Sequence, residues 1–238
     1  SKETTVIIPT MNRSKFLNNC FKYYVHNNFK GQFIILDSSS TKEVIKTTSV
    51  IDKFKSFFKI HYFHKVDHPT QIIKHFANKI QTKYSIVACD DDFYCVDTII
   101  FLEDYLNKNP TIKVVNGKAL RMDILQNNVL VSDYYIHNKC NDSDPYNRLC
   151  DYLLNYGPII QSCLIETKLL IEICKFIPSG KDLNKCPIRI ISDELLMGSI
   201  MVLSSKVVQL DKLILIRTIH GNNSNLSRSH TNNEIILS

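Results

Sequence analysis

Short apolar runs alternate with helix-like segments over the first 110 residues, and this alternation is the strongest constraint on the fold. Apolar or alternating runs occupy residues 4–9, 32–36, 58–64 and 84–89. Apolar side chains at helical spacing fill the intervals, over about 14–26, 41–54 and 69–82. Nearly continuous apolar strands separated by helices are typical of a parallel sheet covered on both faces. The pattern therefore predicts an α/β fold with a mostly parallel central sheet flanked by helices.

The second half of the chain is less regular and predicts a smaller mixed region. Helix signals cover about 96–107, 146–155, 167–176 and 192–203, and strand signals cover 112–115, 119–123, 129–136, 159–165 and 207–216. The Asn127-Asn128 pair is placed to turn a hairpin between two of these strands. We find no internal repeat and no clear boundary, so we expect one domain over residues 1–238.

Polar side chains follow three of the strands predicted in the first half. They lie at Thr10–Arg13, Asp37–Ser40 and Asp90–Asp92. In open α/β sheets the ligand binds outside the carboxyl ends of the strands. We therefore expect these three segments to meet at one edge of the sheet and to form the functional site.

Three consecutive carboxylates, Asp90, Asp91 and Asp92, directly follow the apolar run 84–89. They repel one another at close range, so a cation is needed to compensate them. Mg²⁺ and Mn²⁺ take oxygen ligands, commonly carboxylates together with substrate phosphates. A helix N-cap would need only one of the three, so we favour a metal site.

The glycine count excludes the common glycine-based ways of binding phosphate. The chain has 6 glycines in 238 residues, and it contains neither a G-x-G-x-x-G loop nor a G-x-x-x-x-G-K-[ST] loop. A cation held by carboxylates is then the natural means of binding a diphosphate.

Charge and cysteine spacing bear on partners and compartment. The net charge is +6, but the basic residues are mostly dispersed lysines, whereas nucleic-acid-binding proteins usually cluster arginines. We therefore expect no nucleic-acid partner. The 8 cysteines include no C-x-x-C pair, and several lie in apolar runs, which is typical of reduced, buried thiols. With no signal or membrane-spanning segment in the sequence, we expect a cytoplasmic protein. The basic balance also suits an anionic small substrate or the cytoplasmic membrane face, and a larger multidomain assembly is a further candidate partner.

The ordered set of segments resembles the nucleotide-sugar-binding half of family 2 glycosyltransferases, which have the GT-A fold. Three stretches carry the resemblance: Val6-Ile-Ile-Pro-Thr-Met-Asn-Arg13, Asp37-Ser-Ser-Ser40 and Ser85-Ile-Val-Ala-Cys-Asp-Asp-Asp-Phe93. It covers residues 4–110 well and the remainder loosely. The resemblance implies a nucleotide-sugar-binding half over about 4–110 and an acceptor-binding half over about 111–238.

The resemblance also implies roles for individual residues. Pro9, Thr10, Arg13 and Asp37 would line the pocket for the nucleotide base and ribose. The pattern departs from the family at Asp37, which has Leu36 and Ser38 where a second Asp and a Gly usually stand.

The Asp run corresponds to the Asp-x-Asp element of the family. Asp90 would lie near the ribose and the metal, Asp92 would be the firmer metal ligand, and Asp91 between them would face the nucleotide. On the preceding helix, Lys74 and Asn78 are candidates to face the nucleotide.

An acidic pair, Asp193-Glu194, stands at a predicted helix start and resembles the family's acidic pair near the acceptor. Transfer of a sugar to a hydroxyl needs a carboxylate that takes the proton, and we assign this role to Asp193, with Glu194 as second candidate. The pair could instead cap the helix. By resemblance to C-terminal segments of GT-A enzymes, His220 is a candidate metal contact.

These features together predict a metal-dependent, inverting glycosyltransferase. The donor would be a UDP- or GDP-sugar, the cofactor Mn²⁺ or Mg²⁺, and the acceptor a hydroxyl on a glycan, a lipid-linked saccharide or a protein-linked sugar. One alternative is a non-catalytic nucleotide-sugar-binding or scaffold domain of a larger glycan-assembling protein. A sugar-nucleotide pyrophosphorylase is disfavoured, because Thr10–Ser14 lacks the glycine-rich first loop of such enzymes.

Overall fold

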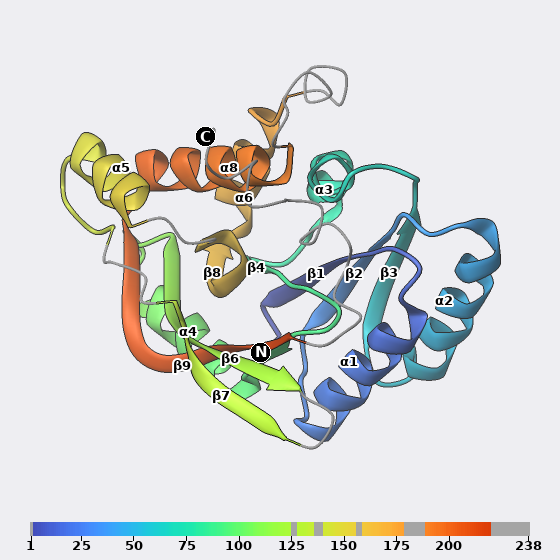
Figure 1. The fold of residues 1–238 in the computed structure, drawn as a ribbon. Helices are drawn as coiled ribbons and strands as arrows, with labels where there is room; N and C mark the ends of the chain where they lie inside the picture. Colours follow the sequence, from blue (N-terminus) through green and yellow to red (C-terminus); the bar gives the residue numbers. More distant parts are fainter. Residues whose placement is uncertain (1, 125–127, 136–139, 156–158, 179–188, 220–238) are drawn as a thin grey trace.

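The structure of the chain is a computed structural model. It describes residues 2–124, 128–135, 140–155, 159–178 and 189–219. Nine strands form one sheet, in the order β3-β2-β1-β4-β8-β6-β9-β5, with β7 paired to β6 (Figure 1). The α/β fold class predicted from the sequence is confirmed.

The first half of the chain builds the parallel part of the sheet. Its elements are β1 (Thr4–Thr10), α1 (Ser14–His26), β2 (Gln32–Asp37), α2 (Thr41–Phe54), β3 (Lys59–His64), α3 (Pro69–Phe76), the 3₁₀ turn η1 (Ala77–Lys79) and β4 (Tyr84–Val87). All three strand pairings in this half are parallel. The carboxyl ends of these four strands therefore lie at one edge of the sheet.

The second half adds the mixed part of the sheet. Its elements are β5 (Phe93–Tyr94), α4 (Val96–Lys108), β6 (Val114–Ile124), β7 (Val129–Tyr135), α5 (Pro145–Leu154), the 3₁₀ turn η2 (Ile159–Ser162), β8 (Cys163–Glu166), α6 (Thr167–Lys175), α8 (Arg189–Ser204) and β9 (Val207–Ile219). β8 is antiparallel to both β4 and β6, whereas β9 is parallel to β6 and antiparallel to β5.

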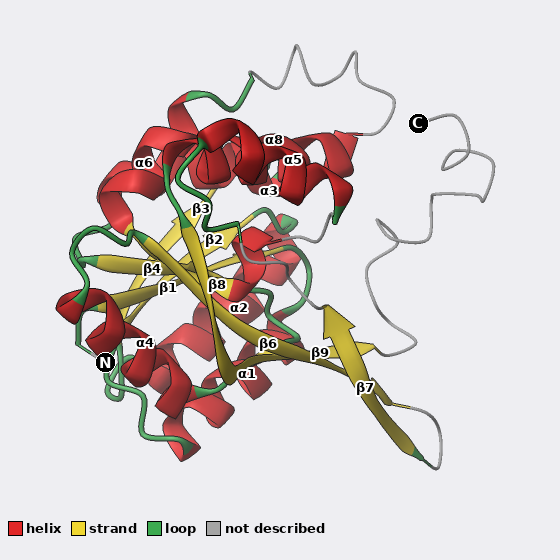
Figure 2. Cartoon of the chain, turned by 90° about the vertical axis from the view of Figure 1, so that its left-hand side faces the viewer, coloured by secondary structure: helices red, strands yellow, loops and turns green. Residues whose placement is uncertain are grey.

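Helices cover both faces of the sheet (Figure 2), and a hydrophobic core lies on each face. Successive strand residues point to opposite faces, so Val6 and Ile8 pack with α1, α2 and α4, while Ile7 packs with α3, α6 and α8. Burial on both faces explains why these strands are almost continuously apolar in sequence.

Extra residues in the long strand β9, opposite Gly117 and Lys118 of β6, let β9 bend back toward the site. The register between β6 and β9 shifts on both sides of Lys118. Gly117 is required there, because a Cβ at this position would collide with the carbonyl oxygen of Lys212. The bend, which is plain in Figure 1, brings the end of β9 beside β5, with Phe93 opposite Ile216.

Several local expectations from the sequence were wrong in detail. Ser14 is the first residue of α1 rather than its N-cap, and its hydroxyl donates to Glu43 Oε1 (2.5 Å). The two strands expected over 112–123 are the single strand β6, which continues past the bulge in β9. The strand expected over 159–165 begins only at Cys163, after the turn η2. The strand expected over 84–89 ends at Val87, because Ala88 and Cys89 already belong to the turn that carries the carboxylates.

Within the described ranges, no helix combines the length and apolar character needed to cross a membrane. The seven cysteines of these ranges have free thiols, as their spacing predicted.

Candidate functional site

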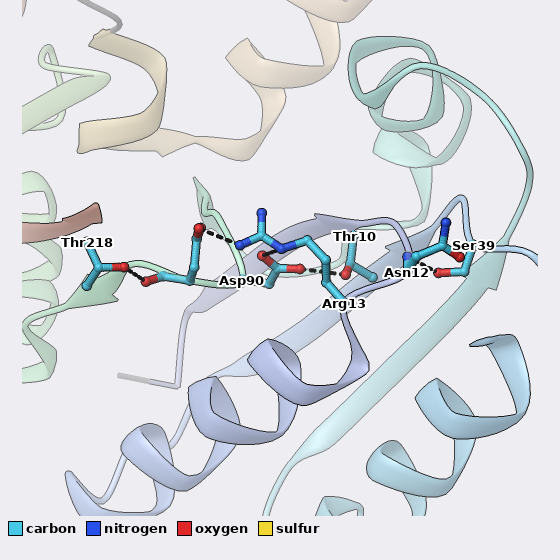
Figure 3. A network of polar contacts seen from close by, with 7 residues as sticks. Thr10, Asn12, Arg13, Ser39, Asp90 and Thr218 are labelled. Carbon is cyan, nitrogen blue, oxygen red and sulfur yellow. Dashed lines mark hydrogen bonds and ion pairs between the residues drawn. The ribbon is translucent and has the colours of Figure 1, made fainter. Parts of the chain in front are cut away.

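The candidate site lies at the carboxyl edge of the sheet, where the turns after β1, β2 and β4 meet. The parallel ladders place Thr10 opposite Asp37 and bring β4 to the other side of β1. The structure therefore brings Thr10, Arg13 and Asp90 together, as the polar strand ends predicted (Figure 3), and Arg13 also binds Asp91.

The turn after β1 is held by the turn after β2. Asn12 has a φ of 57°, a left-handed conformation that Asn tolerates better than most residues. Its backbone N–H donates to Ser39 Oγ (2.7 Å), and its Oδ1 accepts from the N–H of Ser40 (3.0 Å). The N–H of Ser38 donates to the carbonyl of Thr10 (2.9 Å). These bonds fix the position from which Arg13 extends.

Asp90 is buried between Thr10 and Arg13. Thr10 Oγ1 donates to Asp90 Oδ2 (2.6 Å), and Arg13 Nε lies 3.3 Å from Asp90 Oδ1. Only 3% of Asp90 is exposed. Burial raises the pKa of Asp90 to about 7, although Arg13 and the Thr10 hydroxyl oppose the rise.

Arg13 also binds Asp91. Its Nη2 donates to Asp91 Oδ2 (2.5 Å), and its guanidinium group lies over the ring of Phe16, 4.5 Å from the ring centre. One guanidinium group thus spans two neighbouring carboxylates, which lowers their mutual repulsion.

Asp92 points toward the end of β9. Its Oδ1 accepts from the backbone N–H of Thr218 (2.9 Å), and the Thr218 hydroxyl donates to the carbonyl of Asp91. Burial and the neighbouring Asp91 raise the pKa of Asp92 to about 6, while Thr218 and Arg217 oppose the rise. The strand β9 therefore closes the site from the second half of the chain.

Cys89, Asp91 and Asp92 form the group best placed to hold a metal ion. One ligand atom from each lies within 4.8 Å of the other two. Two carboxylate oxygens and a sulfur are a donor set that divalent transition metals accept, so these residues fit a bound cation. Asp90, a predicted metal ligand, is not a member of this group; its carboxylate faces Thr10 and Arg13 instead.

Asp37 and Lys74 make contacts that their sequence pattern did not indicate. Asp37 is fully buried; its Oδ1 accepts from the N–H of Ser39 (2.8 Å) and its Oδ2 from the hydroxyl of Tyr62 (2.8 Å). Lys74 Nζ donates to the carbonyl of Ile177 (2.5 Å). Both side chains hold structural elements together. Pro9 lies in β1 opposite Leu36, and Asn78 is exposed on η1.

The predicted acidic pair lies on α8. Glu194 Oε1 accepts from Gln161 Nε2 (2.8 Å), and the carbonyl of Gln161 accepts from the hydroxyl of Tyr94. Tyr94 follows the Asp run by two residues and also donates to the carbonyl of Val87 at the end of β4 (3.2 Å). Buried contacts thus link Glu194 to the strand that carries the carboxylates. The side chain of Asp193 and all of His220 lie outside the described residues.

Sequence reasoning missed three contributors to the site. Cys89 was interpreted as one of several small buried thiols, although its position directly before the Asp run was a usable signal. Thr218 and Gln161 gave no signal, because each acts through partners distant in the chain.

Compared by sequence, the chain matches no family model and no curated protein. Compared by structure, it is similar to S. aureus TarS in complex with UDP-GlcNAc, with a TM-score of 0.67 and 12% identity over 96% of this chain and 62% of that one. It is also similar to the mannosyltransferase PcManGT from Pyrobaculum calidifontis in complex with GDP-Man and Mn²⁺, with a TM-score of 0.58 and 12% identity over 95% of this chain and 59% of that one. The chain thus has the fold of these nucleotide-sugar-binding proteins and spans about three fifths of their length.

The raised pKa of Asp90 predicts an unusual pH dependence of stability in the absence of metal. Its folded pKa of about 7 lies above the value of about 4 for an unfolded Asp. Its contribution to the unfolding free energy is therefore present below pH about 4 and is lost as the pH rises through about 7. We expect Asp90→Asn to reduce the loss of stability between pH 5 and pH 8 by about 1–3 kcal/mol, measured by urea unfolding. Asp104→Asn, at an exposed carboxylate on α4, is the control; an unchanged pH dependence in Asp90→Asn would contradict this account.

Proposed function

We propose that the chain is a GT-A glycosyltransferase, similar to family 2, that transfers a sugar from a nucleotide-sugar donor to a hydroxyl acceptor. The observation that carries the proposal is the convergence of Asp91, Asp92 and Cys89 at the carboxyl edge of the sheet, beside Arg13 and Thr10. An acidic site that can hold a cation suits a diphosphate better than it suits a neutral ligand. The shared fold with proteins that bind UDP-GlcNAc and GDP-Man supports the same class of donor.

On the donor side, Asp91 and Asp92 would hold the cation. A bound Mn²⁺ or Mg²⁺ would neutralise charge that develops on the leaving nucleoside diphosphate. Arg13 binds Asp90 and Asp91 and so helps to fix the position of the Asp run. We propose that Pro9 and Thr10 line the nucleotide pocket.

Asp37 would serve the same pocket indirectly. Its carboxylate is fully buried and accepts the N–H of Ser39, so it shapes the 38–40 turn. That turn in turn binds the backbone of Asn12. We therefore propose that Asp37 positions the nucleotide-binding turns and does not contact the base itself.

On the acceptor side, a carboxylate of the Asp193-Glu194 pair would take the proton of the acceptor hydroxyl. As that oxygen bonds to the anomeric carbon, the bond from this carbon to the diphosphate oxygen breaks, and the diphosphate leaves with the bonding electrons. Attack from the face opposite the diphosphate inverts the anomeric configuration. Asp193 is our first candidate for the base, and Gln161 would orient Glu194, the second.

The two halves of the sheet suggest separate binding roles, one for the donor and one for the acceptor. We propose that about residues 4–110 bind the donor and about 111–238 bind the acceptor, in one domain. The second half nevertheless reaches the donor side, because β9 supplies the N–H that binds Asp92.

Nucleotide binding should depend on a divalent cation and on Asp92. We expect Mn²⁺ to raise the affinity for UDP or GDP at least about tenfold in titration calorimetry, since the diphosphate would bind through the cation. Asp92→Asn should abolish this gain, whereas Asp97→Asn, an exposed acid at the start of α4, should retain it. Equal nucleotide affinity with and without Mn²⁺ would contradict metal dependence.

Turnover should depend on the acidic pair of α8. If Asp193 is the base, Asp193→Asn should lower kcat by about 10²–10⁴-fold with donor affinity unchanged. A screen of UDP- and GDP-sugars with saccharide acceptors would supply the assay. Glu172→Gln, at an exposed position on α6, is the matched control.

The comparison with Glu194→Gln identifies the base. A larger loss of kcat in Glu194→Gln than in Asp193→Asn would transfer the assignment to Glu194. Transfer at the wild-type rate in both variants would contradict a base in this pair. Donor binding without transfer to any acceptor would instead favour the non-catalytic binding domain.

A further inference from the structure

We infer that Cys89 is a ligand of the divalent cation, together with Asp91 and Asp92, and that its sulfur biases the site against Mg²⁺. This inference rests on the proposed function, because it concerns the cation that would bind the donor diphosphate. The sequence predicted Mn²⁺ or Mg²⁺ as the cofactor. The inference disfavours Mg²⁺ and leaves a transition metal such as Mn²⁺.

The first argument is geometric. The Cys89 sulfur and one oxygen from each of Asp91 and Asp92 lie within 4.8 Å of one another, so all three can reach one ion with small side-chain adjustments. Cys89 is only partly buried, in contrast to the enclosed thiols of Cys20 and Cys163. Its sulfur lies within 4.8 Å of a carboxylate oxygen of Asp92. The sulfur is therefore directed into the carboxylate site and not into the hydrophobic core.

The second argument is the supply of ligand atoms. Asp90 is the obvious further ligand by sequence, but its Oδ2 accepts the Thr10 hydroxyl and its Oδ1 faces Arg13 Nε. Asp90 is also 97% buried. Among the described residues, Cys89 supplies the third atom of the group that Asp91 and Asp92 form.

The third argument is charge. Three carboxylates lie near two guanidinium groups, because Arg13 contacts Asp90 and Asp91, and the charge of Arg217 acts on Asp92. Acidic side chains therefore outnumber basic ones among these residues, and a bound cation would improve the balance.

Ligand chemistry then gives the selectivity. Mg²⁺ demands near-octahedral oxygen coordination, whereas a thiolate is a soft ligand that favours metals such as Zn²⁺. Affinity for a given site generally rises from Mn²⁺ to Co²⁺ along the first transition row. A sulfur ligand should therefore weaken Mg²⁺ relative to Mn²⁺, Co²⁺ and Zn²⁺.

Cobalt spectroscopy of the chelator-treated chain tests the inference without a turnover assay. Co²⁺ is titrated alone and with UDP or GDP into wild type, Cys89→Ser and Cys95→Ser. Cys95 is the matched control, because it is also a partly buried cysteine but is not in the metal group. We expect a near-ultraviolet thiolate-to-cobalt charge-transfer band in wild type and Cys95→Ser, and its loss in Cys89→Ser. The Kd for Co²⁺ should rise at least about tenfold in Cys89→Ser, and the Kd for Mg²⁺ should rise less.

Two outcomes would overturn the inference while leaving the proposed function intact. These are Co²⁺ binding by wild type without the charge-transfer band, and persistence of the band in Cys89→Ser. Failure of wild type to bind any divalent cation, even with a nucleoside diphosphate, would overturn both. If Cys89→Ser does not fold, cadmium NMR of the wild-type chain decides, because sulfur ligation moves the resonance far downfield of an all-oxygen site.

Discussion

The arrangement of the site depends on the burial of two carboxylates, Asp90 and Asp92, in a run of three at the end of a strand. Asp90 and Asp92 are each less than 5% exposed, and burial raises the pKa of both. Such charges are tolerated only when hydrogen bonds and opposite charges compensate them. Arg13 forms ion pairs with two of the carboxylates, and the N–H of Thr218 donates a hydrogen bond to the third. A net negative charge nevertheless remains on the three carboxylates. That remainder is the physical reason to expect a cation.

The fold supplies these partners from segments that are distant in sequence. The parallel ladder between β1 and β4 places Arg13 beside the Asp run, and the bonds between the turns after β1 and β2 hold it there. The bulge in β9, opposite Gly117, bends this strand so that its end reaches Asp92. On the opposite side, Tyr94 connects the end of β4 to Gln161 and hence to Glu194. A substitution in any of these supports should disturb the site without touching a ligand.

Much of this could be predicted from the sequence. The alternation of strands and helices predicts the α/β fold, and the rule that parallel strands end at one edge predicts that Thr10, Arg13 and Asp90–Asp92 lie together. The register of β9 could not be predicted in this way, because it depends on a two-sided shift around Lys118 that has no sequence signature beyond one glycine.

The direction of individual side chains could not be predicted from the sequence either. Asp37 has the position of a ligand-binding residue but is buried by Tyr62, which reaches across from β3. Lys74 was expected to face the site, but it instead binds the segment after α6. Cys89 looked like a core residue because the apolar run includes it, yet the chain leaves β4 at Val87 and the side chain turns into the carboxylate site.

The most direct test of the central claim is the location of the cation in the presence of nucleotide. Crystals of the chain grown with Mn²⁺ and UDP or GDP would be measured at the manganese absorption edge. The account predicts an anomalous peak within bonding distance of Asp91 and Asp92, between the turn after β4 and the nucleotide diphosphate. Nucleotide bound at this edge with no manganese peak, or a peak away from these carboxylates, would contradict it.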